Sequence, residues 1–197
     1  DFCGLVFHAA SPRNVNGEQA ASLAARIRGR AKIVALLADA SDEEIAAAMR
    51  AAQPDMLQLH GSESPARVAG LRAHFGVDVI KAIAVADASD LASVRVYEMA
   101  ADMLLFDAKA PANATRQGGH GVAFDWQVLK GRSFARPWLL AGGLHAENVA
   151  RALGASNAPG VDVSSGVESA PGIKSAEMIR NFMAAARAAS LETETRA

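Results

Sequence analysis

Short apolar runs rich in Val, Ile and Leu recur about every 25 residues along the chain, and segments with helical periodicity separate them. Most runs are apolar at nearly every position, which is typical of parallel strands that are buried on both faces. The predicted strands occupy residues 2–7, 32–37, 55–59, 78–83, 102–106, 137–142 and 160–163. The predicted helices occupy residues 17–28, 41–52, 64–75, 88–100, 145–153 and 173–189.

This alternation predicts an α/β fold, which is commonly either an open doubly wound sheet or a closed eight-stranded barrel. An open sheet has edge strands, which usually alternate or carry charge, and none of the runs clearly does so. The pattern therefore favours a (βα)8 TIM barrel with seven of its eight strand–helix units in this chain. We expect a single barrel domain over residues 1–189, a first βα unit missing before residue 1, and a frayed tail over 190–197.

The composition excludes several classes of protein. The 197 residues include 20 basic and 21 acidic residues without a block of either sign, so the chain lacks the basic surface of a nucleic-acid binder. No apolar run reaches the roughly 18 residues of a membrane span, and the single cysteine, Cys3, cannot form an internal disulfide. We therefore expect a cytoplasmic protein without nucleic-acid or membrane partners. The sequence leaves its oligomeric state, monomer or homodimer, open.

Glycines and serines follow the last two predicted strands at matching positions. AGGL contains Gly142 and Gly143, and DVSSGVE contains Ser164, Ser165 and Gly166. In barrels of this type the loops after the seventh and eighth strands often bind phosphate through backbone N–H groups. We predict a phosphate site here, and the alternative is that the glycines only shape tight turns.

Asp107 follows the apolar residues MLLF at the end of a predicted strand. A carboxyl group in such a partly dry setting keeps its proton more readily than in water, as a general acid requires. The alternative is a loop aspartate that caps a turn. No His, Cys or carboxylate cluster has the spacing of metal ligands, and no dinucleotide or Walker motif is present. We therefore expect neither a metal nor a cofactor.

Seven motifs together make the chain resemble the phosphoribosylanthranilate isomerases of tryptophan biosynthesis. They occur in the family's order and cover the chain from Gly4 to about Phe182: GLVFHAASPRNV, LQLHG, VIKAI, LLFDAKAP, GGHGVAFDW, AGGLHAENV and GVDVSSGVESAPGIKS. The resemblance implies a (βα)8 barrel that converts N-(5-phosphoribosyl)anthranilate to 1-(2-carboxyphenylamino)-1-deoxyribulose 5-phosphate by an Amadori rearrangement. It implies no metal or redox cofactor, and a small phosphosugar–anthranilate substrate as the partner.

The resemblance also assigns roles to individual residues. Asp107 matches the family's general acid, and the two glycine–serine loops match its phosphate site. Arg13 would bind the anthranilate carboxylate, although a surface salt bridge is the alternative. His60 would line the pocket or make a structural hydrogen bond, and Asp162 would lie near the sugar hydroxyls or brace its loop.

The family's general base is a cysteine in a Cys-Gly pair at the end of the first strand. Cys3-Gly4 has this composition, but the residues after it match the family's second strand, and Cys3 lies deep inside a predicted strand. We therefore interpret Cys3 as a core residue and expect the base in the missing first unit. Two alternatives stay open: another phosphosugar-binding barrel enzyme, and a non-catalytic phosphate-binding fragment without a base. Closure of the loop 112–121 over the substrate is also left open.

Overall fold

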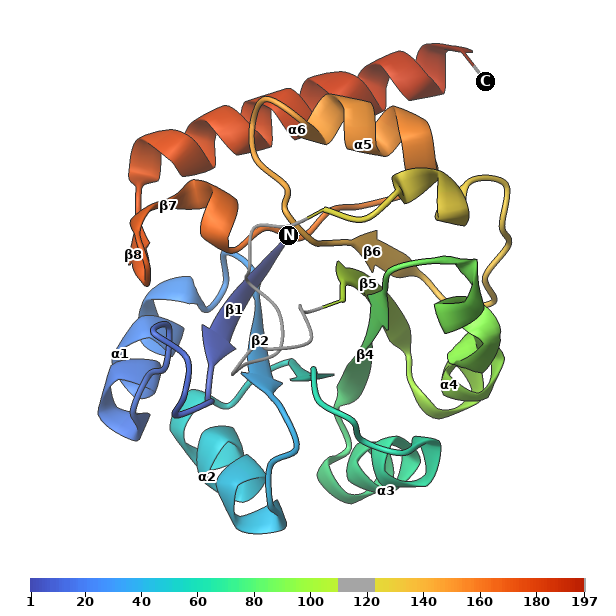
Figure 1. The fold of residues 1–197 in the computed structure, drawn as a ribbon. Helices are drawn as coiled ribbons and strands as arrows, with labels where there is room; N and C mark the ends of the chain where they lie inside the picture. Colours follow the sequence, from blue (N-terminus) through green and yellow to red (C-terminus); the bar gives the residue numbers. More distant parts are fainter. Residues whose placement is uncertain (110–122, 197) are drawn as a thin grey trace. The chain divides into compact units, whose positions relative to one another are not determined.

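The computed structural model describes residues 1–109 and 123–196, and their side chains as far as residue 190. The loop 112–121 therefore lies outside the described residues. Within the described residues, six strands follow in the sheet order β1-β2-β3-β4-β5-β6 (Figure 1). They are β1 (Phe2–Val6), β2 (Lys32–Leu37), β3 (Met56–Leu59), β4 (Asp78–Val85), β5 (Met103–Ala108) and β6 (Trp138–Leu140). The pairs β1–β2, β2–β3 and β3–β4 are parallel, as predicted.

Six α-helices occur in the described part of the chain, together with three 3-10 helices and a small hairpin. The α-helices are α1 (Gly17–Ile27), α2 (Asp42–Ala52), α3 (Pro65–Phe75), α4 (Val94–Ala100), α5 (Val149–Ser156) and α6 (Ala176–Arg196). The 3-10 helices are η1 (Ala88–Ser93), η2 (Trp126–Leu129) and η3 (Ser165–Val167), and β7 (Glu168–Ala170) pairs with β8 (Ile173–Lys174) as an antiparallel hairpin.

The contacts divide the chain into two compact units. Unit 1 contains Asp1–Ala82 and Arg95–Leu104, and unit 2 contains Ile83–Val94 and the described residues from Leu105 onward. The single domain expected over 1–189 stays a prediction.

The core of unit 1 lies between its parallel strands and the helices that follow them. Leu37 and Leu59 of the strands pack with Ile45 of α2 and Val68 of α3, and all four are at most 1% exposed. All four residues of β3 are buried. Burial on both faces explains why these strands read as continuous apolar runs, because polar residues would lose their hydration on either side.

Local signals set the ends of the helices in unit 1. Ser41 and Glu44 form a capping box at the start of α2, and Pro65 occupies the first turn of α3. The C-caps Gln53 and Gly76 adopt the left-handed conformation that ends a helix. Each of these two helices therefore has its ends specified by the local sequence.

Unit 2 differs from the prediction in three places. The predicted strand 160–163 is wrong: only Val161 bridges to Leu140, because the chain turns into the loop 162–167 directly afterwards. Seven strand–helix units are therefore not found in the described residues. Helix α5 begins at Val149 instead of residue 145, and the hairpin β7–β8 occupies the predicted start of α6. The backbone helix α6 continues to Arg196, and fraying of the tail stays a prediction.

No helix among the described residues combines the length and apolarity needed to cross a membrane.

Candidate functional site

Asp107 lies in β5 of unit 2, one residue before the strand ends, and is 7% exposed. Leu105 and Phe106, which precede it, are fully buried. The Ala108 N–H donates a hydrogen bond of 2.9 Å to the Asp107 Oδ1. The predicted acid is therefore a buried carboxyl group at the C-terminal end of a strand.

Gly142 brings the first predicted phosphate loop against this carboxyl group. The Ala141 N–H donates to the Phe106 carbonyl at 2.7 Å, which fixes the end of β6 beside β5. Gly142 has a φ of 89°, and an added Cβ would lie 2.6 Å from the Ala108 nitrogen and 3.1 Å from the Asp107 Oδ1. Only glycine fits this position, because both the backbone conformation and the space exclude a side chain.

The second predicted phosphate loop lies against the first. A Cβ added to Gly166 would overlap the Leu144 carbonyl oxygen, so the two loops approach each other through their backbones. The Asp162 N–H donates to the Leu140 carbonyl at 2.8 Å, which holds the start of the second loop beside β6. Asp107 and both glycine loops are thus assembled within one unit, as expected from the order of parallel strands.

Asn148 stabilises the first loop and was not identified from the sequence. Its side chain is 7% exposed, donates to the Gly143 carbonyl at 2.9 Å and accepts from the His145 N–H at 2.9 Å. The signal was present in HAEN, since asparagine often closes a short turn before a helix.

Lys174 and Glu168 hold the second loop from the hairpin β7–β8. The Lys174 ammonium lies 2.8 Å from the Glu168 carboxylate and donates to the Ser164 carbonyl at 2.8 Å and to the Ser164 hydroxyl at 3.3 Å. A lysine near the predicted phosphate loop could have been identified from the sequence GIKS, but the hairpin that brings it back was not predicted. This side of the loop therefore carries a cation.

The two remaining predicted residues, Arg13 and His60, belong to unit 1. The Arg13 N–H donates to the Ser11 hydroxyl at 3.2 Å within the turn that follows β1. His60 follows β3, its N–H donates to the Leu37 carbonyl at 2.8 Å, and its Nδ1 lies 3.0 Å from the Gln58 amide nitrogen. Their roles toward a substrate stay predictions.

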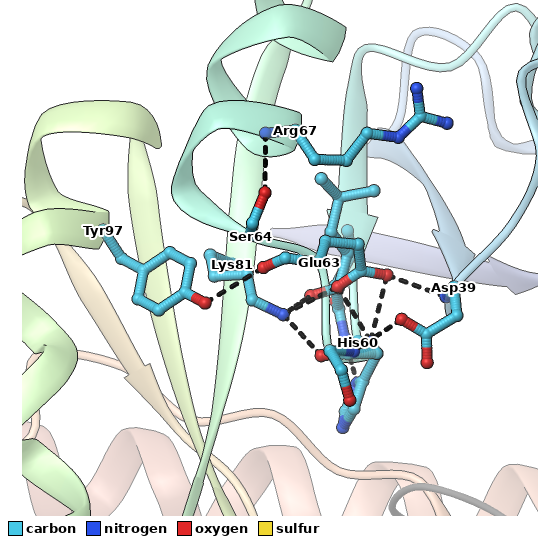
Figure 2. Close-up of polar contacts among 11 residues, drawn as sticks. Asp39, His60, Glu63, Ser64, Arg67, Lys81 and Tyr97 are labelled. Atoms are coloured by element: carbon cyan, nitrogen blue, oxygen red, sulfur yellow. Dashed lines mark hydrogen bonds and ion pairs between the residues drawn. The ribbon is translucent and has the colours of Figure 1, made fainter.

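A buried ion pair beside His60 was also missed from the sequence. Lys81 of β4 and Glu63 of the loop after β3 have side chains 3% and 5% exposed, and Nζ lies 2.7 Å from Oε2 (Figure 2). The signal was a lysine inside the apolar run DVIKAI, where a charge needs a buried partner.

Among the described residues, no group of three His, Cys, Asp or Glu side chains could hold a metal ion. The chemistry that the described side chains of unit 2 offer is proton transfer by a carboxyl group next to two backbone loops that could bind an anion.

The comparisons with known proteins point to one family. The family model of N-(5'-phosphoribosyl)anthranilate (PRA) isomerase matches residues 1–185. An N-(5'-phosphoribosyl)anthranilate isomerase from Afipia carboxidovorans is 54% identical over 190 residues, which are 96% of this chain and 81% of that protein.

Solved structures agree with the sequence comparison. The crystal structure of phosphoribosyl anthranilate isomerase from Thermotoga maritima matches with a TM-score of 0.83 at 30% identity, over 95% of this chain and 88% of that one. A phosphoribosyl anthranilate isomerase in complex with reduced 1-(o-carboxyphenylamino)-1-deoxyribulose 5-phosphate matches with a TM-score of 0.80 at 28% identity, with the same coverage of the two chains.

Proposed function

This chain belongs to the N-(5'-phosphoribosyl)anthranilate isomerase family of tryptophan biosynthesis, and we propose that Asp107 is the general acid of its reaction. The function is an Amadori rearrangement that isomerises N-(5-phosphoribosyl)anthranilate to 1-(2-carboxyphenylamino)-1-deoxyribulose 5-phosphate. The observation that carries the assignment of Asp107 is the close approach of Gly142 to its carboxyl group. A Cβ added to Gly142 would lie 3.1 Å from the Asp107 Oδ1. An anion bound at the glycine loops would hold the sugar next to this acid.

In the proposed mechanism, protonated Asp107 donates its proton to the furanose ring oxygen. The bond between this oxygen and C1 breaks, and the anilino nitrogen supplies the electron pair that forms an iminium ion. A base then removes the C2 proton, and the resulting enolamine tautomerises to the C2 ketone. No atom is gained or lost, so the reaction is an isomerisation. Binding of the phosphate at Gly142, Gly143 and the loop Ser164–Gly166 would keep C2 in place between acid and base.

We propose that the base is a cysteine thiolate from a βα unit that precedes Asp1, and that Cys3 is not the base. Cys3 is the second residue of β1 and pairs with Ile33, so the strand continues beyond it to Val6. A base is expected at the end of a strand, where a substrate can reach it. With that unit the fold would be a complete (βα)8 barrel.

Three substrate contacts complete the proposal. Arg13 would bind the anthranilate carboxylate through its guanidinium, His60 would line the pocket, and Asp162 would lie near the sugar hydroxyls. Location in the cytoplasm and a monomeric or homodimeric state are part of the same proposal.

The test is the variant Asp107→Asn in the protein that includes the proposed preceding βα unit, because that unit would supply the base; asparagine keeps the size of the side chain but cannot donate the acid proton. We expect turnover, followed by the loss of anthranilate-type fluorescence, to fall by about 10²–10⁴-fold. Affinity for the reduced product analogue should stay nearly unchanged. The matched control is Asp125→Asn, because Asp125 caps η2 through the Gln127 N–H, and asparagine caps a helix equally well.

Turnover of Asp107→Asn at the level of the unaltered protein would end the assignment of the acid. If the unaltered protein binds the analogue but does not turn over the substrate, the alternative of a non-catalytic phosphate-binding fragment is correct. Turnover of a different phosphosugar would instead identify another barrel enzyme.

A further inference from the structure

The buried ion pair between Lys81 and Glu63 makes hydrogen bonds with the surrounding backbone. A buried pair is costly in free energy unless the remaining donors and acceptors find partners. The Lys81 ammonium donates to the Leu59 carbonyl at 3.2 Å, to the Gly61 carbonyl at 2.7 Å and to the Glu63 Oε2 at 2.7 Å. These contacts use all three of its protons. The position of the Lys81 side chain is therefore fixed by three acceptors.

The Glu63 carboxylate connects the loops that follow two neighbouring strands. Its Oε1 accepts from the Asp39 N–H at 2.9 Å, beyond the end of β2. Both of its oxygens lie within 3.1 Å of the Gly61 nitrogen, beyond the end of β3. Lys81 lies in the middle of β4, so one carboxylate thus connects the loops after β2 and β3 to this third strand (Figure 2).

Asp39 and Gly61 interlock these two loops. The Asp39 Oδ1 accepts a hydrogen bond of 2.7 Å from the Ser62 N–H. A Cβ added to Gly61 would lie 2.5 Å from the Asp39 nitrogen, so the backbones are in direct contact. Neither loop can shift without the other.

The ionisation of the pair agrees with this geometry. Burial favours the neutral form of Glu63, but the hydrogen bond and the charge of Lys81, together with the Asp39 N–H, outweigh it, and the pKa of Glu63 lies below its usual 4.5. The Tyr97 hydroxyl donates to the Glu63 carbonyl at 3.0 Å. Burial, and then the charge of Glu63, raise the pKa of Tyr97 above 10.0, so the phenol stays a donor at neutral pH. Glu63 therefore stays ionised and Tyr97 stays a hydrogen-bond donor at neutral pH.

We propose that Lys81 and Glu63 are positioning residues for substrate binding, because they fix the turn that carries His60. Gly61, whose N–H and carbonyl are both bonded by the pair, is the next residue after His60. The inference rests on the proposed function, in which His60 lines the pocket. Lys81 and Glu63 act through the backbone and do not touch the substrate.

The location of the cluster formed by Lys81, Glu63 and Tyr97 indicates that it positions the loops and does not only stabilise the fold. A pair that served stability alone could be replaced by apolar side chains without loss. Here the hydrogen bonds of the pair go to backbone groups at the C-terminal strand ends, where parallel α/β proteins bind their ligands. The opposite ends of the same strands are fastened by single carboxylates, such as Asp55 to the Ile33 N–H at 2.7 Å.

The test is the double variant Lys81→Met with Glu63→Gln, which leaves no unpaired buried charge and nearly preserves the volume. Affinity for the reduced product analogue is measured by titration, and folding is checked by circular dichroism. We expect a folded protein with a dissociation constant raised at least tenfold. The control Leu71→Ala, a core change in α3, should lower the urea midpoint while the dissociation constant stays within twofold.

A double-mutant cycle with His60→Ala separates positioning from a general loss of structure. If the pair acts through His60, the double variant should not weaken binding further once His60 is alanine. Independent, additive losses would overturn the inference, and so would unchanged affinity in the folded double variant. Should the double variant fail to fold, Glu63→Gln alone keeps one acceptor oxygen, and the same cycle applies to it.

Binding of the analogue by the unaltered chain tests the proposed function independently of this inference. If it does not bind the analogue, the proposed function fails and the inference fails with it. If it binds the analogue and the variants bind equally well, only the inference fails.

Discussion

The two units hold the loops at their strand ends by different physical means. In unit 1 a buried carboxylate, Glu63, accepts hydrogen bonds from loop N–H groups and is balanced by Lys81. In unit 2 the loops of Gly142 and Gly166 approach neighbouring backbone so closely that a side chain does not fit. The first arrangement depends on charge and the second on volume. Substitutions should therefore disturb the two units in different ways.

The comparison also suggests why the phosphate site is proposed in unit 2. In unit 1 an anion that belongs to the protein, the Glu63 carboxylate, already accepts from the N–H groups of Asp39 and Gly61. In unit 2 the corresponding anion would be the phosphate of the substrate. The loop N–H groups in unit 1 thus donate to an anion of the protein itself, and those in unit 2 would donate to the ligand.

The largest effect in this comparison is expected for Gly166→Ala. The new methyl group would overlap the Leu144 carbonyl, so the two loops must separate, at a cost of about 3 kcal/mol in the free energy of unfolding. Urea unfolding measures this loss. Gly154→Ala is the control, because Gly154 lies in α5 with nothing within 4 Å of an added Cβ, and should stabilise by about 0.5–1 kcal/mol. Equal stability of Gly166→Ala and the unaltered protein would contradict the volume argument.

A smaller loss is expected in unit 1 as the pH falls. Because folding lowers the pKa of Glu63, its contribution to stability is present above the ordinary value of 4.5 and disappears as the pH falls through the lowered value. The urea midpoint of the unaltered protein should therefore decrease in acid. Glu63→Gln should be less stable than the unaltered protein at pH 7, and the difference should shrink in acid. If the difference in stability stayed constant from pH 7 into the acid range, the charge of Glu63 would not stabilise these loops.

Tyr97→Phe should cost about 1 kcal/mol, since it removes one hydrogen bond and leaves the ring in place. The urea midpoint at pH 7 measures the loss. The same substitution combined with Glu63→Gln should show the loss again, because the bond is to the Glu63 carbonyl and not to its carboxylate. A stability equal to that of the unaltered protein would remove Tyr97 from the cluster.

The smallest change in stability is expected for Lys174→Met. The Lys174 side chain is 41% exposed and the Glu168 side chain 4% exposed, but Glu168 also accepts from the Gly172 N–H at 3.3 Å and keeps this bond in the variant. We therefore expect a loss of about 1 kcal/mol or less. The Michaelis constant should nevertheless rise, because Ser164 loses the contact that holds its loop. Lys130→Met, a change of another exposed lysine in unit 2, is the control for the loss of charge alone. An unchanged Michaelis constant would limit Lys174 to a structural contact.

Much of the fold could be predicted because local patterns determine it. The strand 32–37 has the predicted bounds, and the predicted helices 41–52 and 64–75 begin within one residue of α2 and α3, where the sequence supplies the Ser41 capping box and Pro65. Asp107 and Gly142 also follow predicted strands, and the ends of successive parallel strands lie at the same edge of a sheet, although their close approach was not predicted. Periodicity and connection length are sufficient for such features.

The missed features depend on contacts between distant residues. The Asn148 side chain forms hydrogen bonds with Gly143 and His145, which precede it, and α5 therefore begins only at Val149. Helical periodicity in the sequence does not reveal these bonds. Lys81 and Glu63 meet because β3 and β4 pair in one particular register. A lysine in an apolar run indicates that a partner exists, but the register decides which carboxylate it is. The strand predicted at 160–163 was wrong because an apolar run of this length is also compatible with a single bridge.

The contact between Gly61 and Asp39 links two positions that lie 22 residues apart in the sequence. Asp39 itself has a φ of 50°, so its own backbone is already in the left-handed region. A larger residue at position 61 would be tolerated only together with a changed course of the chain at position 39. In related sequences these two sites should vary as a pair, and a swap of the β2–α2 loop between relatives should succeed only when the β3–α3 loop is exchanged with it.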